Sequence, residues 1–208
     1  MEDVLEVYQR PIDAKVPLVC MDEFSKQLLS DPTPPLPMRP NSSAKKDYEY
    51  VREGSVSSFI FALPHEGLRH LYTSETGKIT AQDWAKSIKY LVDEIHPEAD
   101  KIVLVMDNLN THKTASLYAT FPAEEARRIA DKLEIHYTPK HGSWLNMAEI
   151  EIGKLTGSGL KERISSQEEM EKQMQAYLEK ANHAPKPIEW QFANQEARVK
   201  LKSLYPTI

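Results

Sequence analysis

The amino-acid sequence predicts an α/β protein in which helices cover a mixed β-sheet. Two continuous apolar runs, residues 16–23 and 101–108, each lead into an aspartate, a pattern typical of strands buried on both faces. Between them lie a stretch rich in aromatic and β-branched residues and then an amphipathic segment, which predict a hairpin and a crossover helix. With 208 residues, 40% of them apolar, the chain is expected to form a single domain spanning residues 1–208.

The first half of the chain predicts strands joined by one irregular segment. Residues 1–10 favour a short helix, and residues 16–23 favour the first strand, ending at the carboxyl edge of the sheet. The segment at about 30–46 contains five prolines and a pair of lysines, which exclude helix and central strand and predict an extended arm. Residues 48–64 and 68–75 then predict an antiparallel hairpin or meander.

The second half alternates between helical and strand patterns. A capping box opens at Thr80, and apolar residues at helical spacing follow it for about four turns. Residues 101–108 predict a buried strand, residues 121–133 a helix that begins with proline, and residues 134–139 a short strand. We expect Ser143 to cap the next helix and a C-terminal helical part to occupy about 166–208.

Composition excludes several classes of protein without selecting one function. No run approaches the roughly 18 apolar residues of a membrane span, and the N-terminal residues lack signal-peptide order, so we expect a cytoplasmic protein without membrane contact. A single cysteine, Cys20, excludes an intrachain disulfide framework. The formal charge of −5 is unusual for a nucleic-acid enzyme, although a metal-dependent phosphodiester site itself requires clustered carboxylates.

The acids that follow the two apolar runs are the first candidates for chemistry. Adjacent strands lie about 4.8 Å apart, so parallel strands ending in Asp22 and Asp107 would present both carboxylates at one edge. The two charges repel one another unless a cation lies between them, and Mg²⁺ prefers such oxygen ligands. The alternative is that these acids only mark where water begins, and the periodicity alone leaves both interpretations open.

Three sequence blocks carry a family resemblance: CMDE at 20–23, VMDNLNTH at 105–112 and YTPKHGSWLNMAEIE at 137–151. Together they resemble the catalytic blocks of bacterial insertion-sequence transposases of the mariner superfamily, in particular the six-thirty group. The resemblance covers almost the whole chain. It implies a ribonuclease-H-like fold, with three antiparallel strands plus two parallel strands flanked by helices. It also implies that Asp22, Asp107 and Glu149 are the catalytic carboxylates, which hold Mg²⁺ or Mn²⁺, as two ions.

Further residues near these blocks are candidates for supporting roles or DNA contact. Asn146 stands three residues before Glu149, on the same face of a helix, and can orient that carboxylate; an ordinary capping or solvent-facing amide is the alternative. Glu23 and Glu151 point elsewhere on a strand or helix and are not assigned as ligands. The candidates for contact with DNA are Asn108, His112, Lys113, Lys140, and the arm residues Arg39, Lys45 and Lys46.

The resemblance implies an enzyme that cleaves DNA phosphodiester bonds and transfers strands in transposition. The expected partners are transposon ends, target DNA and a second copy of the chain, in the bacterial nucleoid. Related transposases carry helix-turn-helix domains before the catalytic part, whereas only about 20 residues precede Asp22 here, so we expect that DNA-reading half to be separate or removed. Two alternatives remain: a ribonuclease-H-like nuclease without strand transfer, and a non-catalytic remnant that dimerises or binds partners.

Overall fold

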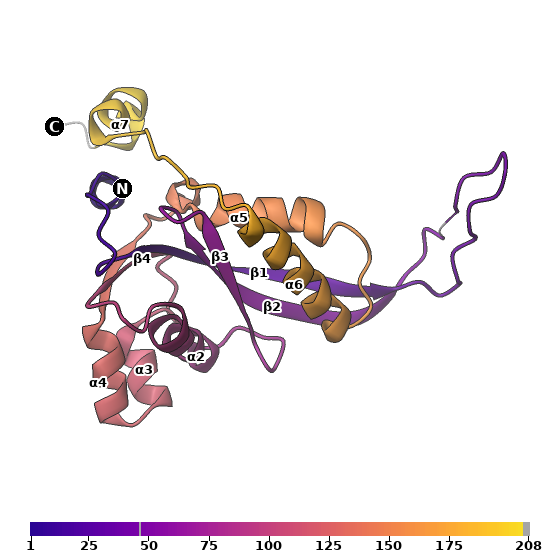
Figure 1. Ribbon diagram of the computed structural model, residues 1–208, viewed down its shortest axis with the longest axis horizontal. Coiled ribbons are helices and arrows are strands. Elements are labelled where there is room, and N and C mark those ends of the chain that lie inside the picture. The colour runs from indigo at the N-terminus through magenta and orange to yellow at the C-terminus, as the bar shows by residue number, and fades with distance from the viewer. Residues whose placement is uncertain (46, 206–208) are drawn as a thin grey trace.

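A computed structural model describes residues 1–45 and 47–205, which contain a five-stranded mixed sheet flanked by helices (Figure 1). The strand order is β3-β2-β1-β4-β5. The strands are β1 (Leu18–Ser30), β2 (Val51–Leu63), β3 (Leu68–Thr73), β4 (Ile102–Met106) and β5 (Leu133–Tyr137). Strands β1 to β3 pair antiparallel, whereas β4 pairs parallel with both β1 and β5. The predicted arrangement of three antiparallel and two parallel strands is therefore confirmed.

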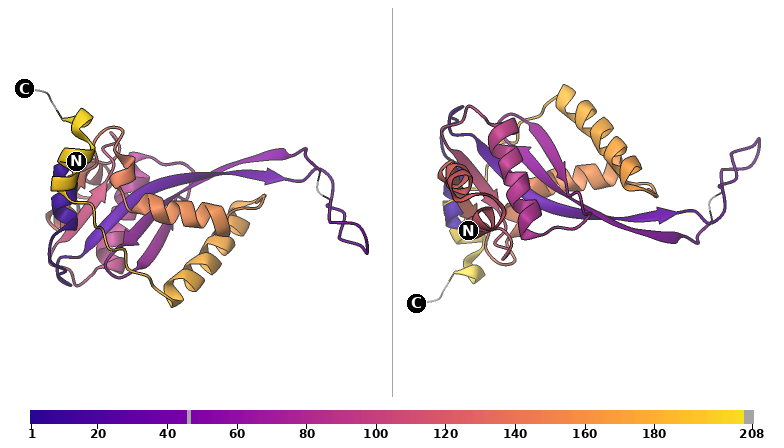
Figure 2. Two further views of the ribbon diagram at one scale, coloured as in Figure 1. Left: turned by 90° about the horizontal axis from the view of Figure 1, so that it is seen from above. Right: turned by 90° about the horizontal axis from the view of Figure 1, so that it is seen from below.

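Helices cover both faces of this sheet (Figure 2). They are α1 (Glu2–Tyr8), α2 (Ala81–Tyr90), α3 (Thr114–Thr120), α4 (Ala123–Asp131), α5 (Ala148–Lys154), α6 (Gln167–His183) and α7 (Asn194–Lys200). A core around Trp84 and Phe59 joins α2, α3 and α4 to one face. Two further clusters lie on the other face, one under α1 and α7 and one under α5 and α6.

Strand β1 is longer than the sequence predicted. It continues past residue 23 to Ser30, because β2 pairs with it as far as Ser30 opposite Val51. Its parallel partner β4 is much shorter and matches only Leu18 to Cys20. The apolar run thus marks only the stretch that has neighbours on both sides and buried residues on both faces.

The prediction for the second half was right for most elements and wrong at two. The capping box at Thr80 is present, with the Thr80 side chain accepting from the Asp83 amide, and a π-helical turn extends α2 to Ile95. Helix α3 was not predicted at all. Ser143 does not cap the helix that bears Glu149, because it begins a separate 3₁₀ turn, Ser143–Leu145, and α5 starts only at Ala148.

The predicted arm follows β1 and projects from the end of the β1–β2 ribbon, away from the sheet (Figure 1). It folds back on itself through backbone pairs between Leu36 and Lys45 and between Arg39 and Ser42. Lys46, which was assigned to this arm, lies outside the described residues.

The first and last α-helices, α1 and α7, lie side by side. Both guanidinium contacts of Arg198 in α7 reach the Glu2 carboxylate in α1, at 2.8 and 2.7 Å, and the Tyr205 hydroxyl donates to the same group at 2.9 Å. These contacts hold the N-terminal helix α1 against the C-terminal part of the described chain. Among the described residues, no helix has the length and apolar character needed to cross a membrane.

Candidate active site

Asp22 and Asp107 lie at equivalent positions of two neighbouring parallel strands. The register pairs Leu18 with Val103 and Cys20 with Val105, and the same offset carried two residues further places Asp107 opposite Asp22. Strand β4 ends at Met106, so Asp107 is the first residue beyond it. Both carboxylates are half-buried. The edge expected to bring these two acids together is therefore present, although Asp22 lies within β1 and not at its end.

Glu149 reaches the same edge from the first turn of α5, which packs across β1 and β2. Glu149 lies near enough to Asp22 for its negative charge to contribute to the raised pKa of Asp22. Burial raises the pKa of Asp22 to about 6, and the negative charges of Asp107 and Glu149 add to this, against a hydrogen bond from the Glu23 amide that lowers it. Three carboxylates from two strands and a helix thus share one electrostatic environment.

Asn146 is buried and fixes Asp22, not Glu149. Its amide nitrogen donates to the Met21 carbonyl at 2.8 Å and to the Asp22 carboxylate at 3.2 Å, while its side-chain oxygen accepts from the Ala148 amide at 3.1 Å. The expectation that it shares a helix face with Glu149 was wrong, because it has an extended backbone conformation before α5 begins. One side chain therefore ties β1 to the start of the helix that carries Glu149.

His112 is also buried, so of the two roles expected for it, DNA contact or support of a carboxylate, the geometry agrees with the second. Only 1% of its side chain is exposed, with its ring stacked on Trp84 at 5.9 Å. Its Nδ1 atom lies 2.6 Å from Asp107 Oδ1, and its Nε2 atom lies 3.4 Å from Glu23 Oε2 without hydrogen-bond geometry. Burial alone would lower the pKa of His112, but the hydrogen bond with Asp107 and the negative charges of Asp107 and Glu23 outweigh it and raise this pKa to about 9.

Glu23 is the residue of this group that sequence reasoning missed. Successive side chains on a strand point to opposite faces, so Glu23 lies on the face away from Asp22, beneath the sheet edge. There it contacts the imidazole that holds Asp107. The adjacent acids DE at 22–23 were the only local signal. The partner of Glu23 is 89 residues away in sequence, so that signal could not identify the contact.

A cleft of about 670 Å³ opens beside Asp107. It is lined by Asn108, which follows Asp107, and by Lys140 from the loop after β5, so both lie where an incoming strand can reach them. Lys113 is exposed at the start of α3, bonded to Asn110 at 3.2 Å, and is not among the cleft's lining residues. Arg39 and Lys45 lie in the arm beyond the far end of β1, remote from the carboxylates.

The donor set fits a divalent cation, although the side chains do not yet surround one. Within the described ranges, no group of three His, Cys, Asp or Glu side chains is arranged to hold a metal ion. However, carboxylate oxygens are the ligands that Mg²⁺ and Mn²⁺ prefer. Burial is the main cause of the raised pKa of Asp22, and the charges of Asp107 and Glu149, which add to it, are ones that a cation would neutralise. Asp107 is drawn toward His112 and must turn from it or share its second oxygen to act as a ligand.

The chain matches one protein family in sequence and resembles a set of solved structures in fold. Residues 17–171, more than half of the chain, match the family described as DDE superfamily endonuclease. No curated protein matches the chain.

Solved structures of the Mos1 mariner protein are similar in fold. A paired end complex with Mn has a TM-score of 0.55 at 13% identity, and the match covers 86% of this chain and 55% of that one. A strand transfer complex gives 0.56 at 13%, covering 86% and 54%. A paired end complex with Mg gives 0.53 at 13%, covering 88% and 57%. The chain thus spans about half the length of these proteins.

Proposed function

Because the chain belongs to the DDE superfamily endonuclease family, we propose that it is the catalytic domain of a DNA transposase, which cleaves phosphodiester bonds and joins the freed end to target DNA. The observation that carries the proposal is the placement of Asp22 in β1 opposite Asp107, the first residue after the parallel strand β4, with Glu149 close enough to contribute to the raised pKa of Asp22. Carboxylates gathered at one edge in this way can supply ligands for the divalent ions of a two-metal phosphoryl transfer.

The three carboxylates would hold two Mg²⁺ or Mn²⁺ ions, which supply activation of the attacking oxygen and stabilisation of the leaving oxygen. The chain itself contributes position and charge. Asn146 fixes the Asp22 carboxylate against β1 and α5, and His112 holds Asp107 from beneath. Because phosphoryl transfer depends mainly on alignment and charge neutralisation, no protein nucleophile is needed. The exposed residues Asn108 and Lys140 of the adjacent cleft would contact the DNA strand.

DNA and a second copy of the chain are the partners that this function implies. The similar Mos1 structures are named as paired end and strand transfer complexes, which supports transposon ends and target DNA as substrates here. A paired complex brings two ends together and therefore favours a homodimer. We assign all of residues 1–208 to this catalytic domain, including the arm at about 30–46 and the C-terminal helical part from about 166.

The test separates cleavage from joining. The protein is incubated with supercoiled plasmid, Mg²⁺ or Mn²⁺ and a labelled oligonucleotide duplex with a free 3′-hydroxyl, and both nicked plasmid and plasmid-linked label are measured. We expect both products from the natural sequence and neither from Asp107→Asn. Asp100→Asn, which removes an exposed acid outside the site, is the matched control and should retain activity. Nicking without joining would identify a nuclease, and neither product would identify a non-catalytic remnant.

A further inference from the structure

A second cleft lies on the other side of α5 from the carboxylates. Helices α5 and α6 come together at one end and diverge toward the other, as the view from above shows (Figure 2). The wedge between them has a volume of about 690 Å³ and β3 contributes to its floor. Its walls are largely small or apolar, and include Gly159, Ala176, Tyr177, Ala181 and Ala184.

The floor of this wedge is a buried ion pair whose hydrogen bonding is incomplete. Arg69 Nε and Glu151 Oε2 lie 2.8 Å apart, and their side chains are only 6% and 2% exposed. Neither atom has a partner with hydrogen-bond geometry. Among the described residues, no acceptor other than Glu151 approaches the Arg69 guanidinium. A buried guanidinium with unused donors that lines an open cleft is suited to an anionic ligand.

The rim of the wedge is cationic although the chain as a whole is acidic. Lys154 pairs with Glu151 at 2.7 Å, whereas Lys180 and Lys186 have no ion-pair partner in the described part of the chain. Counting Arg69, four cationic side chains line the wedge and Glu151 is its single acid. The formal charge of the whole chain is −5, so this wedge is a local exception.

The wedge is close to the carboxylate edge along one helix. Glu149 and Glu151 are two residues apart in α5 and therefore point to nearly opposite sides of it, one toward Asp22 and the other toward Arg69. Lys154 follows Glu149 by five residues, which is about 7.5 Å of helix rise. A strand with one phosphate at the carboxylates can thus pass over α5 into the wedge.

We propose that the wedge between α5 and α6 binds the phosphate backbone of the DNA strand that continues past the carboxylate edge. The ligand is a polyanion because the lining of the wedge has four cationic side chains against one acid, a net formal charge that exceeds what one small anion would neutralise. Phosphate oxygens contact Lys180, Lys186 and the free donors of Arg69, and the small apolar walls admit the deoxyribose rings. This inference rests on the proposed function, since it assumes that DNA is the substrate.

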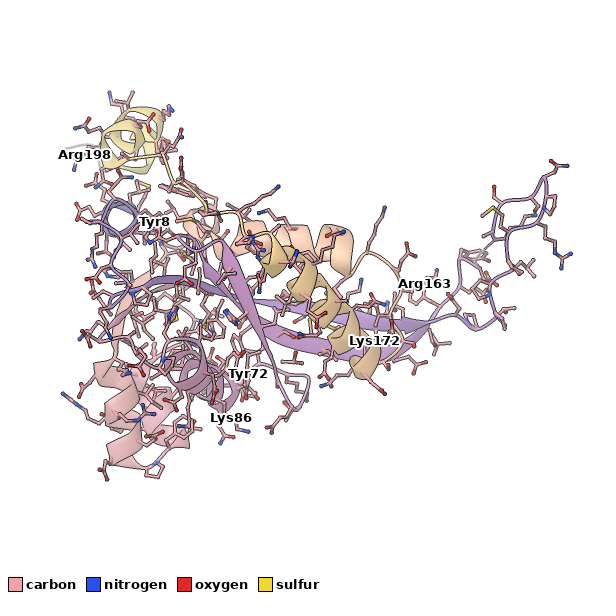
Figure 3. All side chains as sticks on the ribbon, viewed as in Figure 1. Tyr8, Tyr72, Lys86, Arg163, Lys172 and Arg198 are labelled. Atoms are coloured by element: carbon pink, nitrogen blue, oxygen red, sulfur yellow. The ribbon has the colours of Figure 1, made fainter. Side chains whose placement is uncertain are left out.

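The experiment compares two double variants of equal charge. Lys180→Gln/Lys186→Gln removes the unpaired cations of the wedge. Lys161→Gln/Lys172→Gln removes two exposed lysines outside it, and Figure 3 marks Lys172 on the same helix. Binding of a fluorescein-labelled DNA duplex is measured by anisotropy across a salt series in EDTA, where cleavage and metal-bridged binding do not contribute. Circular dichroism confirms that both variants fold.

We expect the wedge variant to reduce the slope of log affinity against log salt by about 1.8, which corresponds to two lost phosphate contacts. The control variant should change the slope by less than about 0.5. If the slope changes equally in the two variants, the effect is one of overall charge and not of the wedge. If the slope is unchanged in the wedge variant, DNA does not bind in this cleft. Either result overturns the inference. If the wedge variant shows the reduced slope but the natural protein does not cleave DNA, the proposed function is wrong and the DNA-binding role of the wedge stands.

Discussion

The imidazole of His112 lies between two carboxylates, with Nδ1 at 2.6 Å from Asp107 and Nε2 at 3.4 Å from Glu23. It therefore connects the end of β4 to the residue that follows Asp22 in β1. Because the ring is buried against Trp84, it cannot leave this position without breaking the core on that face. The orientation of Asp107 is thus determined from beneath the sheet edge.

Replacing His112 by asparagine should lower the free energy of unfolding by about 2 to 4 kcal/mol, because it leaves a cavity and two unpaired carboxylates. Urea denaturation in EDTA measures this. Glu23→Gln should cost less in the His112→Asn variant than in the natural protein, since the charge it removes no longer has a partner. Equal costs in both proteins would show that Glu23 and His112 are not coupled.

Asp22 should make the metal-free protein less stable as the pH rises. Its pKa is about 6 in the folded protein and 3.8 in the unfolded chain, so the folded state holds the proton longer. The stability gained is complete below about pH 3.8 and is lost as the pH rises through about 6. Asp22→Asn should remove this slope and raise the free energy of unfolding at pH 7 by about 1 to 2 kcal/mol. Thermal unfolding in EDTA between pH 4 and 7 measures it; an unchanged slope would contradict the assignment.

Divalent ions should stabilise the folded protein through the same carboxylates. At an ion concentration of 100 times the dissociation constant, the gain is about 2.7 kcal/mol. Mg²⁺ and Mn²⁺ should therefore raise the melting temperature of the natural protein and have little effect on Asp107→Asn. If the variant responds as strongly as the natural protein, Asp107 is not a ligand.

Two glycines give a paired test of the fold. Gly67 has a φ of +68°, and a Cβ there would overlap the backbone of Lys186, so Gly67→Ala should destabilise by about 1 to 3 kcal/mol. Gly153 lies exposed in α5, and a methyl group there would meet nothing within 4 Å, so Gly153→Ala should stabilise by about 0.5 to 1 kcal/mol. Urea midpoints compare them. A neutral Gly67→Ala would show that the segment at Lys186 does not cross the β2–β3 turn this closely.

The sequence was most informative where one local pattern decides the structure. The apolar runs predicted β4 and the first part of β1, and hence the edge that carries Asp22 and Asp107. The polar half of β1 was missed because its pairing with β2 depends on residues far along the chain. Helix α3 was missed because its seven residues have no side-chain cap.

The supporting residues of the site were harder to predict than the acids. Whether Asn146 contacts Glu149 or Asp22 depends on the residue at which α5 begins, and the boundaries of helices are poorly determined by sequence pattern. The burial of His112 depends on Trp84, which α2 supplies from a separate part of the chain. The spacing of residues within a short segment shows neither the residue at which α5 begins nor the packing of Trp84 against His112.

The contact between α1 and α7 also sets how the molecule would respond to mechanical force. Glu2 and Arg198 join the two ends of the described chain, so a pull applied at both ends would load this clasp first. The ion pair can separate before any hydrogen bond between β1 and β4 is stretched. This ion pair would therefore be loaded before the buried apolar contacts that hold α1 against the sheet.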